Sequence, residues 1–305
     1  MNEATNPAWP VPHEPGCSVS SPATRVSDRS SRRSGSFLPT GAPLLWLLGG
    51  VLTIFVGAPI FALIANQAGN QIWPVLSNPQ TSAAVATSLV ATTISTLLVT
   101  VLGVPLAYLL ARVWFPGRAL VGGLIYLPLV LPPVVAGIML LLVWGQAGTF
   151  GQFLEPHGIY FVGEISGIIL AQMFVSAPFV VVASRSAFER VDRDLVEAAR
   201  IAGADSMQIF WAIAVPLSLR AIMAGAALSW MRAFGEFGAT VIMAYHPYSF
   251  SVLTYVQFGS YGLAPVLPMA LLAVALGAAA LAVAALIERI GLVRRLRIGL
   301  LSPAD

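Results

Sequence analysis

Charge is scarce in this sequence: acidic and basic residues together make up 10% of its 305 residues, and lysine does not occur. Soluble domains carry roughly a quarter charged residues, so the composition argues against a soluble globular protein. Hydrophobic residues account for 57% of the chain. The chain is therefore expected to lie in a membrane, provided that its apolar residues form runs of about 20, the length that crosses a bilayer.

Other absences limit the chemistry. No Gly-rich phosphate loop ending in Lys-Ser or Lys-Thr occurs, so the chain is not expected to bind or hydrolyse ATP. Cys17 is the only cysteine and has no disulfide partner. No pair or triad of residues has the character of a metal site or an activated nucleophile. We therefore expect a transport subunit and not an enzyme, with no catalytic residue, metal or cofactor in this chain.

Apolar runs of membrane-spanning length occur six times. Five of the six contain no charged residue, which a buried helix of a soluble protein rarely achieves. The predicted spans are 44–65, 84–110, 119–144, 165–183, 221–244 and 266–287. The sequence thus predicts an all-α polytopic membrane protein with six transmembrane helices. Proline within several spans predicts kinks, above all at "LPLVLPP" (127–133) in the third.

The arginines predict the orientation. Outside the spans they occupy the N-terminal tail, the second and fourth connections and the C-terminal end, whereas the other three connections contain none. This alternation is typical of the positive-inside rule and places both termini and the 185–220 loop in the cytoplasm. Residues 1–43 are predicted to be a disordered cytoplasmic tail, 44–290 the membrane domain and 291–305 a cytoplasmic C-terminal tail. Because the arginines are dispersed, no nucleic-acid partner is expected.

The loop 185–220 interrupts the apolar pattern with a predicted helix–turn–helix. A first helix, with Asp192 near its start, is expected to end at Gly203 as a C′ glycine. Asp205 and Gln208 resemble a capping box that opens a second helix, which Pro216 is expected to stop. Two interpretations stay open: an amphipathic hairpin that packs on its own bundle, or an element that docks on a cytosolic partner.

A fixed-spacing motif within this loop favours the second interpretation. The pattern E-A-A-x3-G-x9-I-x-V-P resembles the EAA signature of ABC-importer permeases and departs from it only by valine for leucine at Val215. By that resemblance the chain has the type I importer fold, and the loop carries the coupling helix that inserts into a cleft of the ATPase subunit. The residues that match the signature are Glu197, Ala198, Ala199, Gly203, Ile213 and Pro216.

Arg232 and Glu236 are the only ionisable residues within any predicted span. Each would cost about 2.5–3.5 kcal/mol at the bilayer centre, so a position facing lipid is not expected. Spaced four apart on one helix face, they can neutralise each other. The pair either fixes helix packing or lies at the translocation pathway or its gate, and the sequence leaves both interpretations open.

The string "RAFGEFGAT" (232–240) resembles a segment of molybdate, sulfate and tungstate permeases. The resemblance implies a cell-membrane permease that works as a homodimer, with two copies of a separate ATPase and an extracytoplasmic binding protein that delivers the oxyanion. Molybdate is the first expectation, and sulfate or tungstate is the alternative. A hypothesis of another class is a secondary transporter that couples an ion gradient through the Arg232–Glu236 pair; a membrane-embedded enzyme ranks last.

Overall fold

The structure, a computed structural model, describes residues 42–66 and 72–300, and all regular secondary structure within these residues is helical. Residues 1–41 and 301–305, which make up most of the predicted N-terminal tail and the end of the predicted C-terminal tail, lie outside the described residues. The all-α prediction is confirmed for the described part. Five helices in it are long and apolar enough to cross a membrane, where the sequence predicted six spans.

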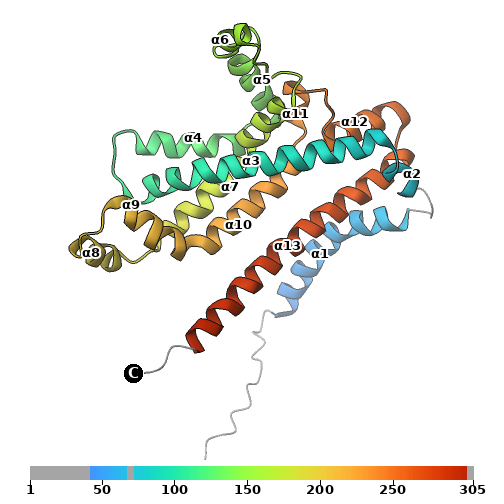
Figure 1. Cartoon of the computed structure of the whole chain (residues 1–305). Coiled ribbons are helices and arrows are strands. Elements are labelled where there is room, and N and C mark those ends of the chain that lie inside the picture. Colours follow the sequence, from blue (N-terminus) through green and yellow to red (C-terminus); the bar gives the residue numbers. More distant parts are fainter. Residues whose placement is uncertain (1–41, 67–71, 301–305) are drawn as a thin grey trace, which may run out of the picture. The chain divides into compact units, whose positions relative to one another are not determined.

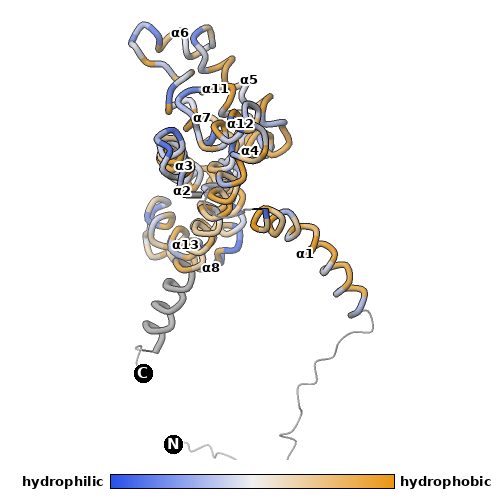
Figure 2. Tube along the Cα trace, turned by 90° about the vertical axis from the view of Figure 1, so that its right-hand side faces the viewer, coloured by the Kyte–Doolittle hydropathy of each residue, from blue (hydrophilic) through white to orange (hydrophobic). Residues whose placement is uncertain are grey.

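The first of these helices is α1, Ala42–Ala65, which contains Pro59. Its 24 residues suffice to cross a bilayer, and hydrophobic residues run along nearly all of it (Figure 2). Most of its side chains are exposed in the isolated chain. This helix crosses the boundary between the two structural units of the chain, at Val56 and Gly57.

Three long helices form the core of the second unit: α3 (Pro79–Arg112), α7 (Ile165–Glu189) and α10 (Val215–Phe234). They lie side by side (Figure 1), and α7 packs against both of the others. Small residues permit this close approach. A Cβ added to Gly103 would lie 3.1 Å from Val181 Cγ2, and one added to Gly225 would lie 2.8 Å from Ala183 Cβ.

The third predicted span is not one kinked helix but two short ones, α4 (Arg118–Val130) and α5 (Pro133–Trp144), of 13 and 12 residues. The break has a local cause. Each residue that precedes a proline is driven towards extended backbone, and Leu131 and Pro132 adopt ψ angles of 135° and 133°. The expected kink is therefore a complete interruption, and neither half reaches the length of a membrane span.

The fifth predicted span, 221–244, also differs. A continuous helical run extends from Ser206 to Phe234, followed by a separate short helix, α11 (Gly238–Met243). The prediction that Pro216 stops a helix is wrong. A π-helical turn, Ile209–Ala214, leads directly into α10, and Pro216 lies in the first turn of α10, where proline is well tolerated.

The remaining elements complete the second unit. They are α2 (Ile72–Leu76), α6 (Gly151–Leu154), a 3₁₀ turn Glu155–His157, α8 (Arg193–Ile201), α9 (Ser206–Gln208), α12 (Phe250–Tyr261), a 3₁₀ turn Ala264–Val266 and α13 (Leu267–Leu300). The last predicted span, 266–287, falls within α13 except for Val266, which ends the preceding 3₁₀ turn. Helix α13 packs against α10. Helix α8 lies near the end of α3 that is followed by α4 (Figure 1).

Candidate functional site

The turn that ends α8 is a complete Schellman motif. The Gly203 N–H donates to Arg200 O at 2.9 Å, and the Ala204 N–H donates to Ala199 O at 2.9 Å. Gly203 has a φ of +90°, a left-handed conformation that glycine adopts without steric cost. The prediction that Gly203 ends this helix is confirmed, and the sharp turn presents the end of α8 to solvent.

The second helix of the loop begins at the predicted capping box. The Gln208 N–H donates to Asp205 Oδ1 at 2.7 Å, and the Asp205 N–H donates to Gln208 Oε1 at 2.9 Å. Both bonds satisfy backbone donors that the start of a helix leaves without a partner. The helix–turn–helix is therefore fixed by local sequence at its turn and needs little support from the bundle there.

Apolar side chains of this loop are exposed. Helix α8 contains no buried residue, and Ile201 at its end is 89% exposed. Met207 and Trp211 on the following helix are also exposed. Met207 and Trp211 belong to the membrane-length run Ser206–Phe234, where lipid can cover them. Ile201 lies outside the membrane-length helices, so its exposure favours the docking interpretation.

The structure divides the six residues of the EAA-like motif between two helices. Glu197 and Ala198 are exposed on α8, Ala199 is half-buried, and Gly203 is exposed in the turn. The other two lie on the next helical run: Ile213 is half-buried in the π-helical turn, and Pro216 is the second residue of α10. The residues on α8 and in its turn can therefore form one contact surface. Ile213 and Pro216 lie outside that surface, on the helical run that supports it.

Arg112 at the end of α3 holds the loop in place, a role that the sequence did not indicate. Its Nε donates to Phe188 O at 2.9 Å, and its Nη2 donates to both Phe188 O and Val191 O. These carbonyls belong to the end of α7 and the segment that leads into α8. In the sequence, Arg112 stands out only as an arginine at the end of an apolar run. The positive-inside rule accounts for an arginine there, so the sequence offered no reason to expect contacts with the loop.

Replacing Arg112 with methionine is expected to loosen α8 without unfolding the bundle. Hydrogen bonds from a charged group contribute about 1.5–3 kcal/mol each, so the loss should raise amide exchange in residues 189–204 by about tenfold or more. Hydrogen–deuterium exchange read by mass spectrometry measures this. Arg220→Met, which removes an arginine from an exposed position of α10, should leave the exchange of that segment unchanged, and equal effects of both changes would contradict the assignment.

Arg232 and Glu236 form an ion pair, with Nη2 to Oε2 at 2.6 Å. They do not share one helix as expected: Arg232 lies in the last turn of α10, and Glu236 follows the helix end at Gly235. The Glu236 side chain is 1% exposed, whereas that of Arg232 is 31% exposed. The buried carboxylate therefore has its charge neutralised by a partner that reaches the protein surface.

Glu236 has further partners at the helix break. Its Oε1 accepts the Ala239 N–H at 2.8 Å, which satisfies one free donor at the start of α11. The Ser251 hydroxyl donates to Glu236 O at 2.6 Å and links the break to α12. Both carboxylate oxygens are thus engaged, and the residue determines how α10 passes into α11.

The two helix interruptions meet beside this pair. Helix α11 packs on α5, and a Cβ added to Gly238 would lie 2.6 Å from Pro133 Cβ. A Cβ added to Gly137 of α5 would lie 2.8 Å from Ile242 Cβ. Non-helical backbone at membrane depth is tolerated only where protein or water surrounds it. The arrangement combines a charged pair with two broken helices, a feature of transport proteins.

Within residues 42–66 and 72–300 no three His, Cys, Asp or Glu side chains gather closely enough to hold a metal ion. The expectation that the chain carries no cofactor stays a prediction.

Long apolar helices, an exposed helix–turn–helix and an intramembrane ion pair define a membrane transport subunit. Residues 103–290 match the family model described as "binding-protein-dependent transport system inner membrane component", and the chain belongs to this family. It is therefore a multi-pass permease of an ABC importer with the type I fold. It is not an enzyme, and ATP hydrolysis belongs to a separate subunit of such importers.

Similar proteins agree with this assignment. The chain is 40% identical over 258 residues to a probable molybdenum ABC transporter permease of Haloferax volcanii, covering 84% of this chain and 94% of the relative. It is 36% identical to the sulfate transport system permease of Salmonella typhimurium, over 70% of this chain and 78% of the relative. A bacterial alginate ABC transporter, solved with a pentasaccharide-bound periplasmic protein, shares the fold with a TM-score of 0.66 at 18% identity, covering 83% and 94% of the two chains.

Proposed function

We propose that this permease imports a tetrahedral oxyanion, with molybdate as the substrate and sulfate or tungstate as the alternatives. The similarity to the molybdenum permease over nearly its whole length supports molybdate. The similarity to a sulfate permease supports the shared oxyanion class. An extracytoplasmic binding protein would deliver the anion, as a periplasmic protein accompanies the alginate transporter of the same fold.

The docking of the ATPase is assigned to the exposed end of the 185–220 loop. The observation that carries this part is α8 itself, a short helix with no buried residue, closed by a rigid turn at Gly203. Glu197, Ala198, Ala199 and Gly203 would contact the ATPase, and Ile213 and Pro216 would support them. ATP-driven closure of two ATPase subunits would then move two copies of this permease between inward- and outward-facing states. Both termini and the loop would lie in the cytoplasm, an orientation that the arginine distribution supports.

Arg232 and Glu236 are assigned to the translocation pathway or its gate. Arg232 reaches the surface of the isolated chain while its partner stays buried, so its guanidinium can attract an anion while the carboxylate, already paired, repels it little. In a homodimer the same exposed side of each copy would contribute to a shared path. The charge of Glu236 would then hold Arg232 in position.

Uptake by the reconstituted importer tests the substrate. Proteoliposomes that contain this permease, its ATPase and its binding protein should accumulate labelled molybdate only when ATP is supplied. Unlabelled tungstate or sulfate should reduce that uptake, in an order that ranks the three anions. If molybdate is not carried and none of the three anions competes, the oxyanion assignment fails.

The Arg232–Glu236 ion pair also fits a second candidate function, an ion-coupled secondary transporter. Proteoliposomes that contain the permease alone should then take up the anion when a proton or sodium gradient is imposed. We expect no such uptake, because the docking role proposed for α8 assigns the energy supply to an ATPase. Gradient-driven uptake without the ATPase would favour the secondary transporter.

A further inference from the structure

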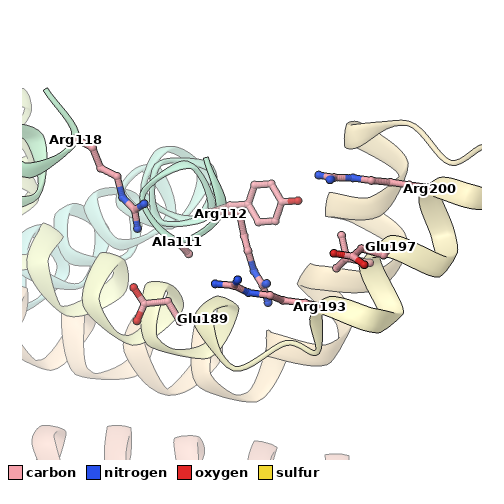
Figure 3. A pocket seen from close by; sticks show the side chains of 9 residues that line it. Ala111, Arg112, Arg118, Glu189, Arg193, Glu197 and Arg200 are labelled. Atoms are coloured by element: carbon pink, nitrogen blue, oxygen red, sulfur yellow. The ribbon is translucent and has the colours of Figure 1, made fainter. Parts of the chain in front are cut away.

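A pocket of about 450 Å³ lies between the end of α3, the end of α7 and α8. Four arginines and two glutamates are among its lining residues, a formal net charge of +2. Figure 3 shows the arginines directed towards the space between these helices, with Arg193 and Arg200 of α8 on the side opposite Arg112 of α3 and Arg118 at the start of α4. The arginines are Arg112, Arg118, Arg193 and Arg200.

None of these four arginines has an ion-pair partner. Among the residues whose side chains the structure describes, the ion pairs are Arg185–Glu189 and Arg232–Glu236; Arg112 donates to backbone carbonyls, and Arg118, Arg193 and Arg200 have no partner for their charge. One of the two glutamates of the pocket, Glu189, is already neutralised by Arg185 at 2.9 Å. The other, Glu197, has no ion pair among the described residues. Convergent like charges repel one another, so an anion that enters the pocket lowers the free energy of the site.

Arg112 gives the pocket a fixed positive group. Its Nε and Nη2 donate to backbone carbonyls of Phe188 and Val191, which leaves Nη1 with two N–H groups for a ligand. Tyr108, which also lines the pocket, packs edge-on against Phe188 and Phe210. The floor of the pocket is thus rigid, while Arg193 and Arg200 on exposed α8 can close over a bound group.

We propose that this pocket binds a tetrahedral oxyanion group. Arginine forks suit the oxygens of such groups, and bonds to charged oxygens are about twice as strong as neutral ones. A tetrahedral dianion would offset part of the positive charge of the four arginines, and the pocket of about 450 Å³ is large enough to hold it with water. The site is separate from the Arg232–Glu236 pair, and the proposal does not depend on which substrate is transported. Because Glu197 and Arg200 belong to the docking loop, an occupied pocket would alter the surface offered to the ATPase.

Two sources can supply this group, a free inorganic oxyanion or the phosphate of an anionic lipid. Arg118 also lines a neighbouring cavity of about 670 Å³ along α4, with Trp114 and Tyr126. That cavity could take an acyl chain beside a headgroup held in the pocket, and basic pockets on the cytoplasmic side of membrane proteins do bind lipid headgroups. The chemistry recognised by the arginines is the same for both sources.

Equilibrium dialysis of the full-length permease in detergent against labelled molybdate, with phosphate as competitor, tests the proposal without any ATPase. The double substitution Arg118→Gln and Arg193→Gln should weaken binding by about tenfold or more. Arg220→Gln, which removes an exposed arginine outside the pocket, should leave binding unchanged. Glu197→Gln should strengthen binding, because it removes a like charge, even though it is expected to impair coupling to the ATPase.

Nanodiscs distinguish the two sources. If the source is free oxyanion, the molybdate affinity should be equal in discs of phosphatidylcholine alone and in discs that contain phosphatidylglycerol. If the source is lipid, phosphatidylglycerol should lower the molybdate affinity of the native permease and leave the already weak binding of the double variant unchanged; either result supports the pocket. Binding that survives the double substitution, or that is lost only with Arg232→Met, overturns it, as does the absence of binding to the native chain under every condition.

Discussion

Arg232→Met is expected to lower the free energy of unfolding by about 3–5 kcal/mol, the loss typical of breaking a buried ion pair from one side. The change leaves the carboxylate of Glu236, which is 1% exposed, without its positive partner. The Ala239 N–H still donates to that carboxylate, but one hydrogen bond does not replace a neutralising charge. Thermal and denaturant unfolding of the detergent-solubilised protein, followed by tryptophan fluorescence, measures the loss.

Glu236→Gln should cost less, about 1–3 kcal/mol, because the amide oxygen can still accept the Ala239 N–H and only the ion pair is lost. The double variant Arg232→Met with Glu236→Gln should be more stable than Arg232→Met alone, since it contains no buried unpaired charge. The difference between the double variant and the sum of the single variants isolates the coupling of the two side chains. Additive losses would show that the pair is not coupled energetically.

The same double variant separates packing from transport. If the pair only fixes the passage from α10 to α11, a folded double variant should retain uptake. If the pair lies on the pathway or its gate, as proposed, the folded double variant should lose uptake by about tenfold or more. The uptake of proteoliposomes, normalised to folded permease, decides between the two roles.

Gly203→Val is expected to abolish coupled uptake while leaving the permease in the membrane. A β-branched residue at a φ of +90° is strained by about 1–3 kcal/mol, so the Schellman turn that ends α8 should open. An added Cβ at Gly203 meets no atom within 4 Å, so the effect does not come from a clash with the bundle. Membrane quantity, ATPase co-purification and uptake measured on the same preparation test this.

Gly158 offers a matched control. It has a φ of +70° and open space around it, and it lies outside the 185–220 loop. Gly158→Val therefore introduces the same kind of strain elsewhere and should retain ATPase co-purification. Gly203→Asn, which tolerates the left-handed region better than valine, should retain most uptake. Normal uptake with Gly203→Val would show that the turn has no role in coupling.

Local features of the site were predictable because their causes are local. Gly203 ends α8 and Asp205–Gln208 forms a capping box, as short-range hydrogen bonding requires. The helix breaks were harder to predict. The sequence showed prolines at 128, 132 and 133, but proline within a membrane helix can produce either a kink or a full break. Pro216 had the opposite outcome. The sequence predicted that it ends a helix, but a π-helical turn precedes it and the helix continues beyond it.

By itself the sequence determined the class of protein. Long uncharged apolar runs can be stable only in lipid, and the spacing from Glu197 to Pro216 indicates the docking loop of an importer. The tertiary structure decided which distant groups meet. It brought Arg112 to the carbonyls before α8, placed Glu236 in a break between two helices instead of on one helix face, and gathered arginines of three segments around one pocket. The contacts of Arg112 and the gathering of the pocket arginines join residues far apart in the chain, and no periodicity along one segment reports the position of another.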